Sequence, residues 1–153
     1  MRRRNTPPLF KLLLFVVLFL LIVLLGFGLF SPERQAKRTV EKFYSQEQEG
    51  NFSESWELLH PFLKEKFPKA VFIQDRTHVF MGHFGANTFS YTISGGDKIK
   101  AWRMEKGRRA FKEGFRFQVT QSYQGKYGKF NFQQDVVVTK EKGQWLILWD
   151  YNQ

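Results

Sequence analysis

Residues 111–123, FKEGFRFQVTQSY, decide the fold of this chain. Apolar residues occupy alternate positions in this stretch, which is the pattern of a β-strand with one buried face. A second alternating run follows at residues 130–138, FNFQQDVVV, and Gly125 and Gly128 flank the turn between the two runs. The expected buried face of this pair comprises Phe115, Phe117, Val119, Tyr123, Phe130, Phe132, Val136 and Val138.

Three further runs extend the predicted sheet. Residues 88–94 alternate in the same way, and the Gly95–Asp97 segment that follows is a hairpin signal. The next run, residues 98–105, changes phase part-way along, which predicts a bulge near Ala101. The last run, residues 145–149, is apolar on both faces, as is typical of a central strand. We therefore expect an antiparallel sheet of four or five strands.

The residues before the sheet show helical spacing. Ser31 and Pro32 suit the cap and first turn of a helix. A second short helix is predicted at residues 51–59, and a third from Pro68 to about Phe84. The fold class is therefore α+β, with three helices packed on a curved antiparallel sheet. The apolar stripe of the first helix consists of Ala36, Val40, Phe43 and Tyr44.

Residues 12–30, LLLFVVLFLLIVLLGFGLF, contain no charge. At 1.5 Å per residue such a helix is about 28 Å long, close to the roughly 30 Å hydrocarbon core of a bilayer. The run is longer than the apolar region of a cleavable signal peptide, and Gly28-Leu29-Phe30 is a poor cleavage site. We therefore expect a retained signal anchor, that is, a single transmembrane helix.

Positive charge before the span sets the expected orientation. Arg2, Arg3 and Arg4 lie in a very short tail, and such tails stay in the cytoplasm. The sequence thus predicts a cytoplasmic basic tail at residues 1–11, a transmembrane helix at 12–30 and an extracytoplasmic domain at 31–153 in the cell membrane.

The amino-acid composition excludes several kinds of site and indicates the charge of the expected partner. The chain has no cysteine, which excludes disulfides, cysteine-ligated zinc, a thiol nucleophile and a lipid-modified cysteine. Of its 24 Lys and Arg residues, four precede residue 31, which leaves 20 against 14 Asp and Glu. A basic domain favours anionic partners such as acidic lipid headgroups or wall polymers. An extracytoplasmic location argues against nucleic acid.

The order of elements carries a family resemblance. A short loop and the helix containing Trp56 follow the first helix, a third helix precedes the sheet, and residues 143–150 read G-x-W-x-I-x-W-D. This arrangement resembles the nuclear transport factor 2-like superfamily, whose domains are cones of three helices on a bent sheet. The ending is most similar to the non-catalytic N-terminal domain of methicillin-resistance-type penicillin-binding proteins, which follows a membrane anchor. The chain has no S-x-x-K motif, so the resemblance implies only the non-catalytic module.

Enzymes of that superfamily use Asp, His and Tyr at the mouth of the cone. Here Asp75 and His78 lie three residues apart on a predicted helix, with His83 further on, and we interpret them as an exposed helix face and not as an acid/base pair. Asp135 is expected on the polar face of a strand, and Asp150 is expected at the solvated end of a strand, so both are interpreted as structural. The histidines lack the spacing of metal ligands, and the glycine pairs do not precede helices. We expect no catalytic residue, metal site or cofactor.

Two groups of residues are candidates for binding. One is a set of aromatic residues that would line a cavity in the cone or, alternatively, form a dry core. Its members are Trp56, Phe80, Tyr91, Trp102, Phe117, Tyr123, Trp145 and Trp149. The other is a basic cluster that would bind anions or, alternatively, form a solvated turn. Its members are Lys98, Lys100, Arg103, Arg108, Arg109 and Lys112.

These features favour a non-enzymatic, membrane-anchored interaction module of the bacterial cell envelope. Its expected partner is an envelope protein or an anionic envelope polymer. The sequence is also compatible with a homodimer. One alternative is a structural subunit of a secretion or conjugation apparatus. Another is a small-ligand binder or enzyme that uses the cone cavity. Fold alone cannot decide between them.

The predicted orientation can be tested with reporters fused after Gln153. A reporter active only outside the cytoplasm should be active, because the three arginines hold the N-terminus inside. A reporter active only in the cytoplasm should be silent. The reverse pattern of activity would reject the orientation.

Overall fold

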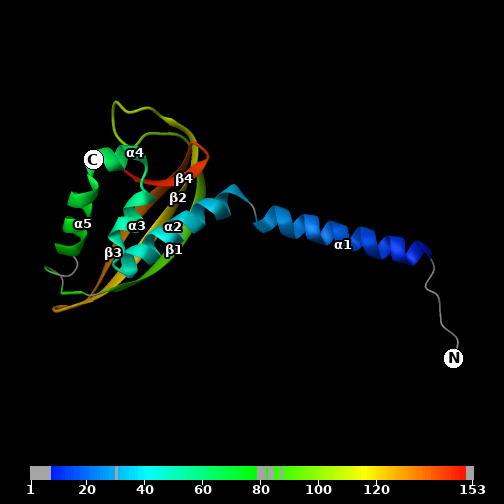
Figure 1. Ribbon diagram of the computed structural model, residues 1–153, viewed down its shortest axis with the longest axis horizontal. Coiled ribbons are helices and arrows are strands. Elements are labelled where there is room, and N and C mark those ends of the chain that lie inside the picture. The colour runs from blue at the N-terminus through cyan, green and yellow to red at the C-terminus, as the bar shows by residue number, and fades with distance from the viewer. Residues whose placement is uncertain (1–7, 30, 79–81, 83–84, 87, 151–153) are drawn as a thin grey trace.

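The computed structural model describes residues 8–29, 31–78, 82, 85–86 and 88–150, and within the first helix it describes the side chains of residues 9 and 11–21. Helices precede a four-stranded antiparallel sheet of order β1-β2-β3-β4, which confirms the α+β class (Figure 1). The elements are α1 (Pro8–Leu29), α2 (Pro32–Gln48), α3 (Phe52–Glu57), α4 (Pro61–Lys66), α5 (Lys69–Thr77), β1 (Phe89–Trp102), β2 (Phe111–Gly125), β3 (Gly128–Glu141) and β4 (Gln144–Trp149).

Strands β2 and β3 form the predicted hairpin. Gly125 pairs with Gly128 across the turn. On the predicted face of β2, Phe117, Val119 and Tyr123 are buried, and Phe115 is partly buried. On β3 the prediction fails at Phe132, whose side chain is 50% exposed. The buried positions of β3 are residues 136–139, so the first half of this strand extends past the core.

Strand β1 is continuous, so the predicted hairpin at Gly95–Asp97 is wrong. Its register with β2 shifts between Gly95 and Asp97, which makes this segment a bulge within one strand. Gly95 and Gly96 have φ values of 81° and 127°, a region that favours glycine. Ala101 has a φ of 51°, but the register is the same on both sides of it. The predicted bulge is therefore displaced to the glycines.

Strand β4 is an edge strand, not the central strand that its sequence predicted. Its outer side is covered by the loop between α3 and α4. The Ile147 amide donates to the Leu58 carbonyl, and the His60 amide donates to the Ile147 carbonyl, both at 2.9 Å. This parallel bridge pairs the edge at Ile147. Ile147 and Leu148, on opposite faces of β4, are buried, and Trp145, Leu146 and Trp149 are partly buried.

The helices cover one face of the sheet (Figure 1). The predicted stripe of α2 is buried, and the Ser31 hydroxyl accepts from the Arg34 amide as the cap. Helix α4 lies between the predicted helices at residues 51–59 and from Pro68, where no helix is predicted. Proline is tolerated at the first position of a helix, and here the His60 imidazole caps α4 by accepting from the Phe62 amide at 3.1 Å.

The third predicted helix corresponds to α5 in the described residues, and α5 ends at Thr77. Phe72 on this helix is buried, whereas Ile73 packs partly against the core. The rest of that predicted helix, including Phe80, His83 and Phe84, falls largely outside the described residues.

Helix α1 includes most of the predicted span at residues 12–30 and extends away from the domain in Figure 1. Its described leucines and valines are exposed, for example Leu12 at 64% and Leu20 at 53%. Over the residues whose placement is described, no helix meets the length and apolarity needed to cross a membrane.

The contrast between Phe117 and Phe132 tests the core. Phe117→Ala should lower the free energy of unfolding by about 3–5 kcal/mol, because the removed ring leaves a cavity in a closed core. Phe132→Ala is the matched control, and half-exposure should limit its cost to about 1 kcal/mol. Urea unfolding of residues 31–153 measures both. Equal losses would show that β3 is misplaced.

Candidate anion-binding cleft

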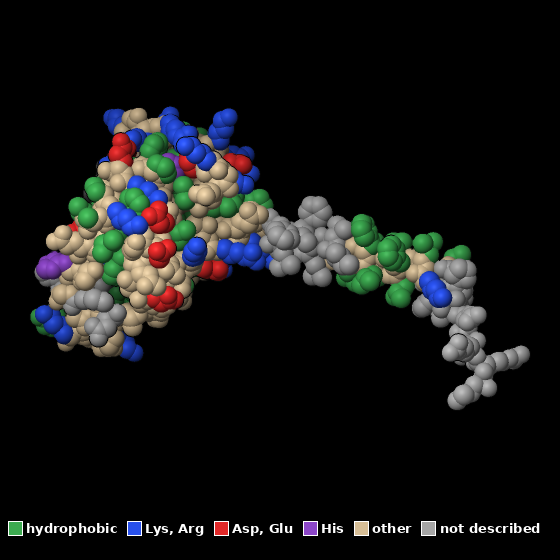
Figure 2. Space-filling view, in the orientation of Figure 1, with side chains coloured by type: hydrophobic (Ala, Val, Ile, Leu, Met, Phe, Trp, Pro, Cys, Tyr) green, Lys and Arg blue, Asp and Glu red, His purple; other side chains and the backbone are tan. Residues whose placement is uncertain are grey.

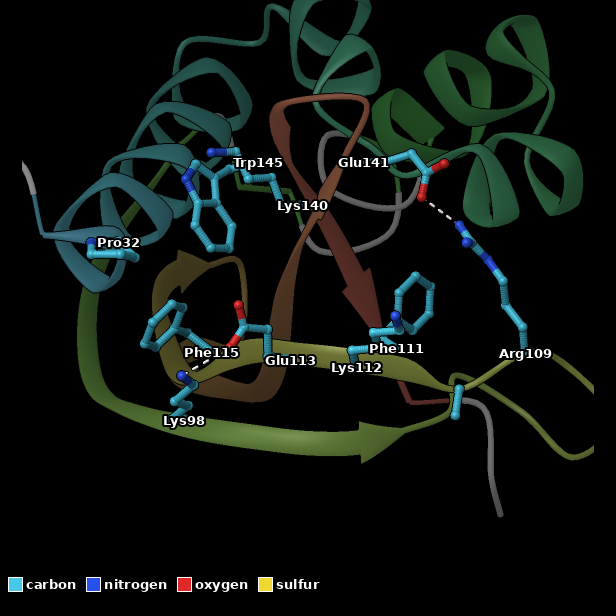
Figure 3. A pocket seen from close by; sticks show the side chains of 11 residues that line it. Pro32, Lys98, Arg109, Phe111, Lys112, Glu113, Phe115, Lys140, Glu141 and Trp145 are labelled. Atoms are coloured by element: carbon cyan, nitrogen blue, oxygen red, sulfur yellow. Dashed lines mark hydrogen bonds and ion pairs between the residues drawn. The ribbon is translucent and has the colours of Figure 1, made fainter.

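A cleft of about 480 Å³ lies at the end of the sheet where α2 begins (Figure 3). All four strands or their connections surround it, and Pro32 closes it on the side of α2. Four of its lining side chains are basic and two are acidic. The lining residues are Pro32, Lys98, Arg109, Ala110, Phe111, Lys112, Glu113, Phe115, Lys140, Glu141 and Trp145.

One wall of the cleft is aromatic. The Phe115 and Trp145 rings lie 5.7 Å apart between centroids. The Trp145 indole Nε1 donates to Gln35 Oε1 of α2 at 3.3 Å, which fixes the ring against the helix. Lys140 is paired directly with Trp145 across the β3–β4 hairpin and places its ammonium 5.7 Å from that ring. This wall therefore presents an apolar surface with a cation at its edge.

The opposite wall is an arginine held on three sides. The Arg109 guanidinium donates to Glu141 Oε2, and its carbon lies 5.5 Å from the Phe62 ring and 5.3 Å from the Phe111 ring. Glu141 is shared with the buried His60, whose Nε2 lies 3.5 Å from Glu141 Oε2. The Arg109 hydrogen bond, with help from His60, lowers the pKa of Glu141. The carboxylate therefore stays ionised and keeps the arginine in place.

The floor carries two further cations. Lys98 pairs with Glu113 at 2.8 Å, and this contact lowers the pKa of Glu113. Figure 3 shows this pair and the Arg109–Glu141 pair at the two ends of the cleft. Within the part of the chain that the structure describes, the Lys112 ammonium makes no ion pair or hydrogen bond. The positive charge of Lys112 is thus available for a ligand, whereas the charges of Lys98 and Arg109 are balanced by carboxylates.

The structure divides the predicted basic cluster. Lys98, Arg109 and Lys112 line the cleft, and Lys100 shares the sheet face of Lys98. Arg108 instead pairs with Glu65 and Glu105, at 2.8 and 2.9 Å. Arg103 lines a second hollow of about 560 Å³ with Trp102 and Arg116. Figure 2 shows basic side chains along the upper edge of the domain and beside the junction with α1.

Sequence reasoning missed Lys140, which belongs to the cleft although it lies 28 positions after Lys112 in the chain. Antiparallel pairing of β2 with β3 produces this proximity. The signal in the sequence is the pair Lys140 and Trp145, equally spaced about the Lys142-Gly143 turn, which places them opposite each other in a hairpin.

The predicted cavity-lining aromatics do not gather around one space. Trp145 lines the cleft and Trp102 the second hollow. Phe117 and Tyr123 are buried in the core. The others in the described residues pack partly against that core, and Phe80 lies outside the described residues. These partly buried residues are Trp56, Tyr91 and Trp149.

A buried polar cluster lies on the inner side of α2. The Glu47 carboxylate accepts from the Ser55 hydroxyl, and its Oε2 lies 3.3 Å from Arg76 Nε. Burial raises the pKa of Glu47, although Arg76 opposes that effect. Burial also raises the pKa of Tyr44, whose hydroxyl donates to Gln134. These groups satisfy one another and join α2, α3, α5 and β3.

The residues weighed for catalysis that the structure describes are exposed, and His83 lies outside the described residues. Asp75 and His78 lie on the solvent side at the end of α5, and Asp135 and Asp150 are exposed on or after strands. Among the described residues, no three His, Asp or Glu side chains gather in a way that could hold a metal ion. The comparison with protein-family models finds no match for this chain, and the comparison with curated proteins finds none either.

The buried His60 gives a testable pH dependence. Burial lowers the pKa of this imidazole below its ordinary value of about 6.5. As pH falls below about 6.5 the unfolded chain therefore binds more protons than the folded chain, and the free energy of unfolding falls by up to about 1.4 kcal/mol per pH unit. His60→Asn keeps a capping side chain and should flatten this slope.

Urea unfolding of residues 31–153 at several pH values between about 5 and 8 measures the effect. Glu47 titrates in both proteins and cancels in the comparison. His78→Asn, at an exposed position, is the control and should keep the wild-type slope. A slope in His60→Asn equal to that of the wild type would contradict the assignment.

Proposed function

We propose that this chain is a non-enzymatic interaction module of the bacterial cell envelope, anchored in the membrane by residues 12–30. Residues 1–11 form the cytoplasmic tail, and residues 31–153 form the extracytoplasmic domain. The domain binds an anionic ligand of the envelope through the basic cleft. The observation that carries this proposal is the position of the cleft at the end of the domain that directly follows the apolar helix.

The anchor is supported by the 19 uncharged residues from Leu12 to Phe30 and by the three arginines before them. The described side chains of α1 are apolar and exposed except for Lys11 near its start, as a lipid-facing helix requires. In water, an exposed apolar helix of this kind would drive aggregation.

The binding role is supported by the chemistry of the cleft. Four cations surround it against two carboxylates, which gives a local charge of +2. Both carboxylates are occupied by cations of the cleft itself. A ligand therefore meets unbalanced positive charge together with an apolar wall.

The fold adds support for a binding role. The order of helices followed by a four-stranded antiparallel sheet is compatible with the cone of the nuclear transport factor 2-like superfamily, which the sequence resembles. In the penicillin-binding proteins that the sequence resembles, this domain is non-catalytic. The exposed positions of Asp75 and His78 also favour binding over catalysis, since a general acid or base needs an enclosed site.

Extraction of membranes tests the anchor. The full chain should stay in the membrane pellet after alkaline carbonate treatment, because about 19 buried apolar residues hold it there. A chain without residues 8–29 should be released and keep its folded circular dichroism spectrum. Release of the full chain, or retention of the shortened one, would contradict the proposal.

A further inference from the structure

The cleft lies very close in the chain to the end of the proposed anchor. Pro32, which lines the cleft, is two residues after Phe30, the last residue of the uncharged run. Two residues span at most about 7 Å. The polar headgroup layer on each side of a bilayer is about 5–7 Å thick. If residues 12–30 cross the membrane, the α2 side of the cleft is therefore at the level of the lipid headgroups.

The charges of the cleft suit a phosphate monoanion. Arg109 and Lys98 are each already paired with a carboxylate, and these pairs fix the two ends of the cleft. Lys112 and Lys140 then supply cations without a carboxylate partner among the described residues. These two ammonium groups account for the net charge of +2 in the cleft, which attracts one or two negative charges and repels cations such as choline.

The aromatic wall suits a ligand with an apolar part. Phe115 and Trp145 form a surface that continues toward Pro32, as Figure 3 shows. A free phosphate ion would leave this surface in water. A phosphate that carries glycerol and the start of acyl chains would cover it. Tryptophan rings also favour the membrane–water interface for the same amphipathic reason.

We propose that the cleft binds the headgroup of an anionic phospholipid, such as phosphatidylglycerol, from the membrane leaflet in which α1 ends. Lys112 and Lys140 contact the phosphate, and Phe115 and Trp145 contact the glycerol and upper acyl region. This inference rests on the proposed anchor and names the ligand of the same cleft. It also makes the lipid a second contact between domain and membrane, which fixes the orientation of the domain.

Photo-crosslinking in bilayer discs tests the inference. The full chain carries p-benzoylphenylalanine in place of Phe115 and is reconstituted in discs of phosphatidylcholine with or without phosphatidylglycerol. After irradiation, mass spectrometry identifies the attached lipid. We expect phosphatidylglycerol adducts in the mixed discs, well above its share of the lipid, and few adducts in discs of phosphatidylcholine alone. The same probe at Phe132, which is 50% exposed and lies outside the cleft, is the control position.

Two charge-reversal variants separate the cleft from overall charge. Lys112→Glu with Lys140→Glu should reduce the phosphatidylglycerol adduct at position 115 by at least about twentyfold, since one basic residue near an anionic surface is worth roughly fivefold. Lys126→Glu with Lys129→Glu makes the same change in net charge at the other end of β3, where Gly125 pairs with Gly128, and should leave the adduct within about twofold. Near-ultraviolet circular dichroism checks the fold, and Lys→Gln changes at 112 and 140 give a milder version of the cleft variant.

The ligand source is tested in discs of phosphatidylcholine alone with soluble polyglycerol phosphate added. Adducts with that polymer and not with phosphatidylglycerol would overturn the lipid assignment in favour of a wall polymer. Equal adducts with both phospholipids, or equal loss in the two charge-reversal variants, would also overturn it. Because the chain is embedded in every disc, these failures leave the anchor standing. A chain that does not enter discs at all would instead reject the proposed function.

Discussion

The arrangement of the domain depends on two backbone hydrogen bonds at Ile147. They join the outer edge of β4 to Leu58 and His60 and so attach the α3–α4 loop to the sheet. Without that loop, β4 would present unpaired amides and carbonyls and an apolar surface to water. The same contact places His60 in the core, where it caps α4 and faces Glu141. Glu141 in turn holds Arg109, so one wall of the cleft is built outward from the covered edge.

The bulge in β1 sets the other side of the cleft. At Gly95 and Gly96 the strand bends, and a Cβ at Gly96 would lie only 2.7 Å from Glu33 Oε1. The Glu33 side chain thus packs against Gly96, and the positive φ values of Gly95 and Gly96 favour glycine at both positions. Trp145 is anchored to Gln35, two residues further along α2. The start of the helix, the bulge and the aromatic wall are therefore parts of one packing arrangement.

Local patterns predicted most of the fold and part of the cleft. The alternation in β2 and the stripe of α2 each reflect burial on one face, and burial leaves a direct mark on the sequence. The Gly95-Gly96 pair was misread because glycine serves hairpins and bulges alike. The position of β4 was misread because burial of Ile147 and Leu148 on opposite faces makes WLILW apolar, and this pattern does not show whether a strand or a loop pairs with the outer edge. Phe132 shows the opposite case, an apolar residue in phase that the helices do not reach.

The cleft was harder to predict, because its charges come from distant parts of the chain. Lys98, Lys112 and Lys140 belong to three strands, and only the pairing register brings them together. Their neighbours Arg103 and Arg108 were equally good candidates by sequence, yet the structure places Arg108 against Glu65 and Arg103 in another hollow. The clustering of basic residues in the sequence indicates only that the region is positively charged. The composition of the cleft depends on which of these side chains lie on the same face of the sheet.

The short join between α1 and α2 has a consequence for the kind of affinity that the cleft needs. Only two residues separate Leu29 from Pro32, so the anchor that we propose would keep the cleft and the membrane surface within about 10 Å of each other. A ligand confined to that surface is encountered by lateral diffusion in two dimensions. Tethering at this range corresponds to an effective concentration in the millimolar range or above. At such a concentration, a weak and rapidly exchanging contact is sufficient to keep the cleft occupied. The cleft then needs to discriminate between the different ligands at the membrane surface more than it needs high affinity for one of them.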